Sequence, residues 1–133
     1  FYRDPLPRHT VTSEMRLNGI TNADQMPKVE IVYTYLDANP KLVDIARQSG
    51  ANGIVVAAFP TGSPGHLTES LKEAEKNGVA VVLSHRGGKG RIRLGREFPS
   101  ADNLTPQKAR ILLMLALLNG KSSGELDEIF LTY

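Results

Sequence analysis

Two short runs of apolar residues constrain the fold of this chain more than any other feature. Ile54 to Ala58 and Val79 to Leu83 contain only apolar side chains and are rich in valine. A strand with one solvated face alternates apolar and polar residues, whereas a strand of a parallel sheet is covered on both faces and is apolar throughout. The two runs therefore predict neighbouring strands of a parallel sheet.

The residues between these two runs predict a helix. It begins near Ser63, places Leu67, Leu71 and Ala74 on an inward face, and ends at Gly78. A glycine just past the last helical turn is a common helix stop, because it adopts the left-handed backbone conformation easily. The order strand, helix, strand is that of a parallel βαβ unit.

An earlier strand is predicted at residues 29–36. This stretch is rich in β-branched and aromatic residues, which favour extended backbone. Tyr33 and Tyr35 project from one face of such a strand, and we expect them to pack within the fold.

A helix should follow that strand. Asn39 can cap its first turn, and Pro40 fits the first helical position, where the missing N–H has no cost. Leu42, Ile45 and Ala46 share one apolar face of this helix.

The C-terminal third predicts one more short strand and two helices. The strand falls at residues 91–94, and a strongly apolar helix spans 106–118. Ser122 and Glu125 have the spacing of a capping box, which opens a last helix through Phe130.

These elements together indicate an α/β fold with three layers. We expect a short parallel sheet of about four strands with helices on both faces, a Rossmann-like arrangement. Residues 1–27 carry several prolines and no sustained apolar period, so we interpret them as an interdomain linker or arm, with a short strand near 10–12. Residues 28–133 form the α/β domain in this prediction.

Composition excludes several classes of function. The formal net charge of +2 is too small to indicate a nucleic-acid partner. The longest apolar stretch, 111–118, is far shorter than the ~20 residues of a membrane span. Without cysteine there is no disulfide framework and no thiolate metal site. The chain starts at Phe1 rather than at a methionine, which predicts a processed protein or a piece of a longer one.

The turn 60–65 is the first candidate site. It follows a buried strand, and ligands of such sheets approach the carboxyl ends of the strands. Gly62 and Gly65 would let another backbone or a ligand come close, while Thr61 and Ser63 add hydroxyl groups. The following helix start favours a carboxylate or phosphate. The alternative is a tight loop in which Ser63 only caps the helix.

A basic tract is the second unusual feature. Residues 85–96 hold five Lys or Arg side chains and one histidine, with no acid. The tract could clamp an anion, which would make the chain a small anion- or nucleotide-binding module, or it could be a solvated loop. Aromatic residues do not alternate with the basic ones, so single-stranded nucleic acid is a poor fit.

No catalytic group is predicted in this chain. His9, His66 and His85 are scattered, and no serine–histidine–aspartate set or metal-ligand spacing is evident. We therefore expect no catalytic residue, no metal and no cofactor.

The helix that starts at Pro106 opens with the residues Pro-Gln-Lys-Ala-Arg, and residues 128–133 close the chain with a helix and a final tyrosine. In these two stretches the chain resembles the C-terminal domain of bacterial L-asparaginases of the type II kind, and the Pro-Gln-Lys-Ala-Arg helix is the most specific match. Further similar stretches are spread along nearly the whole chain, at 1–10, 28–33, 53–57 and 73–82.

The resemblance implies a parent enzyme that hydrolyses the side-chain amide of asparagine, and often of glutamine, without a metal. In that family the nucleophilic threonine and its Thr-Asp-Lys set belong to the N-terminal domain. This chain alone would then be inactive. It would pack on the N-terminal domain of its own and of a neighbouring subunit in a homo-oligomer and complete the neighbour's site for a small amino-acid substrate. The compartment would be the bacterial periplasm or cytoplasm.

The resemblance also assigns substrate-binding positions. The family's loop after the second strand is usually Gly-Asn-Gly-Asn and contributes an asparagine; the matching positions here are Thr61, Gly62 and Ser63. An acidic residue after the third strand contacts the substrate's α-amino group in the family, and Glu97 is the candidate here. A purely structural oligomerisation domain remains a further alternative.

Overall fold

A computed structural model describes residues 13–17, 19–87, 89–92 and 97–133 of the chain. Its centre is a parallel sheet with the strand order β1-β2-β3, where β1 is Val29–Tyr33, β2 is Gly53–Ala58 and β3 is Ala80–His85. The strands are in register from Val29 opposite Gly53 and from Gly53 opposite Ala80. The predicted α/β class is confirmed.

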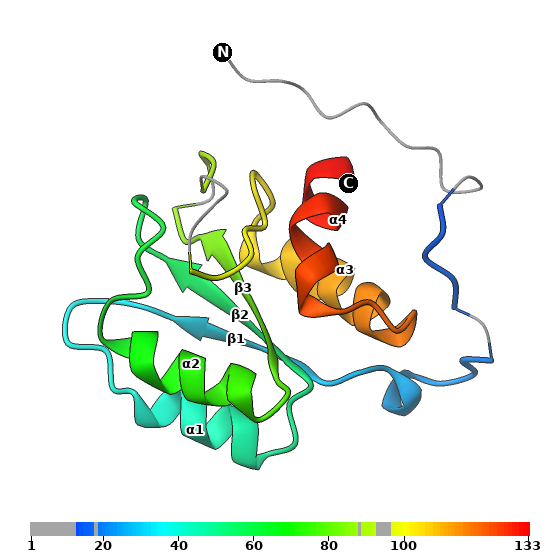
Figure 1. Cartoon of the computed structure of the whole chain (residues 1–133), viewed down its shortest axis with the longest axis horizontal. Helices are drawn as coiled ribbons and strands as arrows, with labels where there is room; N and C mark the ends of the chain where they lie inside the picture. The colour runs from blue at the N-terminus through cyan, green and yellow to red at the C-terminus, as the bar shows by residue number, and fades with distance from the viewer. Residues whose placement is uncertain (1–12, 18, 88, 93–96) are drawn as a thin grey trace.

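Helices cover both faces of this sheet, as predicted (Figure 1). One face packs against α1 (Lys41–Gln48) and α2 (Thr68–Lys76), which join consecutive strands. The other face packs against α3 (Pro106–Leu118) and α4 (Leu126–Thr132). With a helical layer on either side, every residue of β2 is buried, which explains its continuous apolar run.

The predicted fourth strand at 91–94 is not found where the structure describes it. Arg91 and Ile92 lie in no strand, and residues 93 and 94 are outside the described part of the chain. The Ile92 N–H instead donates to the carbonyl of Asp102, and its carbonyl accepts from the Ser100 hydroxyl. Among the described residues, the sheet extends beyond β3 by one parallel bridge, between Leu83 and Ser100.

The predicted helix signals in the C-terminal third are confirmed. The Thr105 hydroxyl accepts from the N–H of Lys108 at the start of α3, and Pro106 is the first helical residue. Ser122 and Glu125 form the expected capping box, in a 3-10 turn that leads into α4. Hydrogen bonds from the backbone and hydroxyl of Ser122 lower the pKa of Glu125 to about 2.

The face of α2 is also as predicted, because Leu67, Leu71 and Ala74 are completely buried. The expected start of α1 is shifted by one residue: the helix begins at Lys41 and Pro40 occupies the N-cap, while the Asn39 side chain still accepts from the N–H of Lys41.

Two expectations near β1 are wrong. Of the three residues predicted to form the buried face of α1, only Ala46 is buried, whereas Leu42 is 38% exposed and Ile45 is 61% exposed. The second buried residue of the helix is Val43. Tyr33 and Tyr35 are exposed by almost half. The physical reason is that β1 ends the described sheet and α1 is the outer helix on its face, so nothing in the described chain covers these side chains.

The described part of the N-terminal segment packs beside the C-terminal helices. The Ser13 hydroxyl is 2.6 Å from the hydroxyl of Tyr133, and the backbone of Arg16 exchanges two hydrogen bonds with the side chain of Asn119. The strand expected near 10–12 lies outside the described residues. The assignment of residues 1–27 as an interdomain linker stays a prediction.

Candidate functional site

The turn 60–65 lies at the carboxyl edge of the sheet, directly after β2. The N–H of Gly62 donates to the carbonyl of Phe59 over 2.7 Å, and the N–H of Phe59 donates to the carbonyl of Ser63 over 3.3 Å. Gly62 has a φ of +76°, a backbone conformation that favours glycine. These two hydrogen bonds close the turn on itself, so its shape is fixed without a ligand.

Gly65 allows a close approach, but the approaching groups belong to the chain itself. Its φ is +60°, and a Cβ at this position would lie 3.3 Å from the ring of Phe59 and 3.3 Å from the hydroxyl of Thr34. That buried hydroxyl donates to the carbonyl of Pro64 over 2.8 Å. The second half of the turn is therefore held to the end of β1.

The first half of the turn is open. Pro60 and Thr61 are exposed, Gly62 is buried and Ser63 is partly buried. The Ser63 hydroxyl accepts from the N–H of Gly65 over 3.1 Å, as in the capping alternative. Of the three predicted substrate-binding positions in the turn, Thr61 is thus the one whose side chain faces outward on a rigid support.

Arg86 is a further residue at this edge. Its guanidinium donates to the carbonyl of Thr34 over 2.8 Å and lies 4.4 Å from the ring centre of Phe59, while its N–H donates to Ala58. Arg86 therefore joins the ends of all three strands. The sequence marked it as one cation of the basic tract but gave no signal for this positioning role.

In the described part of the basic tract, the side chains of Arg86 and Arg91 contact groups of the chain itself. Arg91 makes a two-point ion pair with Asp102, with N–O distances of 2.5 and 2.6 Å, and the Asp102 side chain is only 8% exposed. Two of the five cations of the basic tract, Arg86 and Arg91, thus bind groups within the chain. Arg93 and Arg96 are outside the described residues.

The ion pair of Glu97 is with a residue of α2 and not with the turn 60–65. Its carboxylate contacts the amine of Lys72 on α2 at 2.9 Å, and Lys72 contacts Glu69 at the same distance. The hydrogen bonds with Glu97 and then Glu69 raise the pKa of Lys72. Desolvation, and secondarily the charge of Glu97, raise the pKa of Glu75. The substrate-binding role of Glu97 stays a prediction.

No acid–base machinery is evident in the described parts of the chain. His85 accepts the N–H of Gly87 at its Nδ1 atom over 2.9 Å, and His66 is exposed in the first turn after Gly65. Within these residues there is no group of three or more histidines and carboxylates that could hold a metal ion. Likewise, none of the described helices is long and apolar enough to span a bilayer.

Comparison with known proteins gives one consistent result. The family profile described as "Glutaminase/Asparaginase C-terminal domain" matches residues 28–130. The L-asparaginase 2 of Bacillus subtilis is 35% identical over 132 residues, which cover 95% of this chain and 34% of that protein. The glutaminase-asparaginase of Pseudomonas aeruginosa is 34% identical over 142 residues, covering 100% of this chain and 38% of that protein.

A solved structure agrees with these relatives. The probable cytoplasmic L-asparaginase of Campylobacter jejuni superposes with a TM-score of 0.87 at 35% identity, and the match covers 100% of this chain and 42% of that one. The chain spans little more than a third of the length of the curated relatives it matches.

Proposed function

This chain belongs to the Glutaminase/Asparaginase C-terminal domain family, and we propose that it is the C-terminal domain of an amidohydrolase that converts asparagine to aspartate and ammonia. Its relatives carry the names L-asparaginase and glutaminase-asparaginase. Since it covers only part of their length, the nucleophile is assigned to an N-terminal domain with which this chain assembles.

The proposed contribution of this chain to the active site is the exposed first half of the turn 60–65. We assign Thr61 to the substrate site of a neighbouring subunit, with Gly62 and Ser63 fixing its position. This assignment is supported by one observation above all: the turn is closed by its own hydrogen bonds, yet Thr61 stays exposed at the carboxyl edge of the sheet. Such a preformed group acts on a substrate without an ordering cost.

Arg86 stabilises the residues that hold the turn 60–65 in place. It holds the ends of β1 and β2 together through Thr34 and Phe59, and both of these contact the turn. Arg86 is therefore a positioning residue in this proposal. Glu97 is the proposed partner of the substrate's amino group, which requires its release from Lys72.

The test measures ammonia release from asparagine by the full-length gene product that carries this chain, and by the 133-residue chain alone. We expect turnover from the former and none from the latter. Turnover by the isolated chain would contradict the proposed division of labour, and inactivity of the full-length protein on both asparagine and glutamine would contradict the amidohydrolase assignment.

A single substitution tests the role of Thr61. In the full-length protein, Thr61→Val should lower kcat/KM by about tenfold, the cost of one hydrogen bond of ~1.4 kcal/mol. The control is Thr132→Val on α4, whose hydroxyl donates to the carbonyl of Glu128 in the same helix. Equal activity of the two variants would remove Thr61 from the site.

A further inference from the structure

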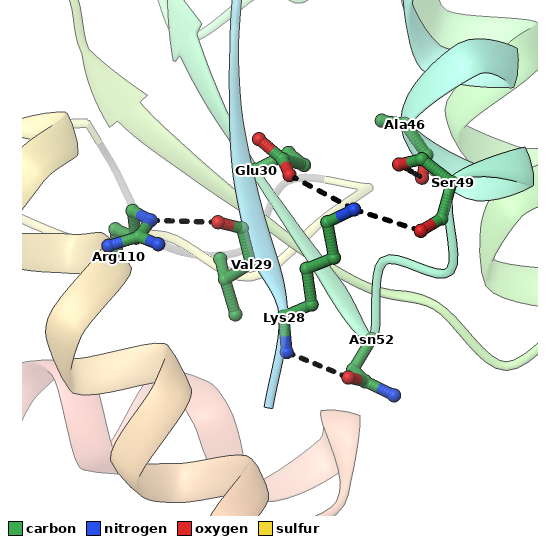
Figure 2. A network of polar contacts seen from close by, with 7 residues as sticks. All are labelled: Lys28, Val29, Glu30, Ala46, Ser49, Asn52 and Arg110. Carbon is green, nitrogen blue, oxygen red and sulfur yellow. Dashed lines mark hydrogen bonds and ion pairs between the residues drawn. The ribbon is translucent and has the colours of Figure 1, made fainter. Parts of the chain in front are cut away.

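The two ends of the parallel strands differ in how completely their polar groups are paired. At the amino edge of the sheet, the amine of Lys28 donates to the carbonyl of Ser49 over 2.9 Å (Figure 2). The guanidinium of Arg110 donates to the carbonyl of Val29 over 2.8 Å at the same edge. At the carboxyl edge, one ring nitrogen of His85 is paired, and the described part of the chain offers no partner for the other. This edge therefore carries a polar atom that the described fold does not use.

His85 lies at the same edge of the sheet as the turn 60–65. It is the last residue of β3 and pairs with Ala58, the last residue of β2, which leads into the turn. Because side chains alternate between the two faces of a strand, His85 is on the same face as Leu83, which belongs to the core shared with α1 and α2. The turn leads into α2 on that face. His85 is partly exposed there, at the edge that also carries Thr61.

The hydrogen bond of His85 fixes the position of its ring hydrogen. The N–H of Gly87 donates to Nδ1 over 2.9 Å, so Nδ1 carries no hydrogen. A neutral imidazole has one accepting and one donating nitrogen, and Nε2 is therefore the donor. His85 is thus prepared to donate one hydrogen bond to a ligand and to accept none.

Two glycines shape the space around this ring. A Cβ at Gly87 would lie 2.6 Å from Cε1 of His85, which is too close for any side chain. A Cβ at Gly90 would lie 3.3 Å from Nε2, and the φ of +115° at Gly90 also favours glycine. This is close to the distance at which an oxygen accepts a hydrogen bond from an N–H group. The missing side chain of Gly90 therefore leaves room for an acceptor atom at Nε2.

The charges near the ring favour an anionic acceptor. Arg86 follows His85 directly, and its guanidinium carbon lies 4.4 Å from the ring centre of Phe59. Lys89 is exposed, and the described residues provide no carboxylate that pairs with it. Residues 85–96 contain no acid. A carboxylate group fits this combination, because it accepts a hydrogen bond from a neutral N–H group and is attracted by both cations.

We propose that His85 is a ligand-binding residue that donates from Nε2 to a carboxylate group of a small amino-acid substrate. The carboxylate follows from the local chemistry, whereas its place in an amide substrate rests on the proposed function. Thr61, after β2, and His85, at the end of β3, then contact the same molecule from neighbouring strands. Gly87 keeps the imidazole in the donating form, and Gly90 keeps the acceptor position open.

The first experiment determines the tautomer of His85 in the 133-residue chain by long-range 1H–15N NMR. The chain contains three histidines, and His85→Asn identifies the signal of His85 by its loss. At about pH 8, above the range in which histidine side chains usually titrate, we expect the hydrogen on Nε2. A hydrogen on Nδ1, or an equal mixture of both forms, would overturn the proposal, because Nε2 would then be an acceptor that repels a carboxylate.

The second experiment measures the binding of L-aspartate to the full-length protein by calorimetry. This amino acid carries the carboxylate groups and is the product of the proposed reaction. His85→Asn keeps an oxygen that can accept from the N–H of Gly87 but removes the Nε2 donor. We expect the dissociation constant to rise at least about tenfold, as for the loss of a hydrogen bond to a charged group.

Two further variants of the histidines make this result specific. His85→Gln places an amide donor near the position of Nε2 and should recover part of the lost affinity. His66→Asn is the matched control, since His66 is exposed and precedes α2, and it should leave the dissociation constant unchanged. Equal affinities of His85→Asn and His66→Asn would remove His85 from the site.

A pair of glycine variants tests the space at Nε2. Gly90→Ala fills the position of the acceptor and should also raise the dissociation constant for L-aspartate at least about tenfold. Gly124→Ala is the control, because a Cβ at Gly124 meets no other atom within 4 Å. Circular dichroism and the NMR signal of His85 show that each variant is folded and that the ring keeps its place.

Failure of this inference and failure of the proposed function are distinguishable. Ammonia release from asparagine tests the amidohydrolase assignment, whereas L-aspartate binding is measured whether or not the protein turns over. A protein that binds L-aspartate through His85 but releases no ammonia would keep the carboxylate site and refute the reaction. Absence of L-aspartate binding, or an affinity that does not change in His85→Asn, would overturn the inference itself.

Discussion

The helices α1 and α2 cover the same face of the sheet and have similar lengths, yet they are buried to different extents. The apolar residues Leu67, Leu71 and Ala74 on and just before α2 are fully buried, whereas Leu42 and Ile45 of α1 remain exposed. Both helices carry an apolar face by pattern. Their surroundings make the difference.

The helix α2 has further neighbours besides the sheet. It packs against α1, and its buried residues share one core cluster with Ile92 and Phe98 from the segment after β3. The helix α1 has α2 beside it on one side (Figure 1). Its residues Leu42 and Ile45 line a groove of about 390 Å³ that is shared with β1. The comparison teaches that apolar patterning marks the face a helix needs to bury, and that the position of the helix decides whether the chain alone can bury it.

The largest effect should come from truncating a buried residue of α2. Leu71→Ala removes a fully buried side chain and should lower the free energy of unfolding by ~2–5 kcal/mol. Leu42→Ala in α1 should cost the monomer less than ~1 kcal/mol. Urea unfolding of both variants at low protein concentration measures the difference, and equal losses would contradict the comparison.

The turns that lead into the two helices should respond in opposite directions. Gly65→Ala places a Cβ at a φ of +60°, against Phe59 and Thr34, and should cost ~1–2 kcal/mol or more. Asp37, before α1, has a φ of +59° and is exposed, so Asp37→Gly should stabilise by up to ~1 kcal/mol. Thermal unfolding of the two variants gives both signs, and a gain from Gly65→Ala would show that the turn is not constrained as described.

On the outer face of α1, a polar substitution should be nearly neutral for the monomer. Ile45→Lys should change the free energy of unfolding by no more than ~0.5 kcal/mol, because the side chain is mostly exposed. The measurement is made at a concentration where the chain is monomeric. A loss above ~2 kcal/mol would mean that Ile45 is buried in the single chain.

The smallest effect concerns the pH dependence of stability through Glu75 on α2. Desolvation, followed by the charge of Glu97, raises the pKa of this carboxyl group above 4.5 in the folded chain. The folded state then holds its proton where the unfolded state has lost it. Its contribution to stability is full below pH 4.5 and declines as the pH rises through the raised pKa.

The variant Glu75→Gln should flatten this part of the stability profile, and Glu73→Gln on the same helix is the control. Urea unfolding between pH 4 and 7 measures the slope. An unchanged slope for Glu75→Gln would mean that the carboxyl group titrates normally.

The sequence predicted the turn 60–65 as a structural feature, but it could not separate the roles of its residues. Spacing alone gave Gly62 and Gly65 the same role. In the structure Gly65 accommodates the ring of Phe59 and the hydroxyl of Thr34, and Thr34 comes from the end of β1. Of the three predicted substrate-binding positions in the turn, only Thr61 is exposed. The fate of Arg91 was equally hidden, because its buried partner Asp102 is a neighbour in space and not in the basic tract.

Local patterns determined the elements whose causes are local. The apolar runs of β2 and β3, the cap at Thr105 and the capping box at Ser122 follow from the covalent order of neighbouring residues. Only the tertiary structure decided which strand ended the described sheet, and with it the exposure of Leu42 and Ile45. Periodicity records how one element is built, whereas burial depends on what the rest of the molecule places beside it.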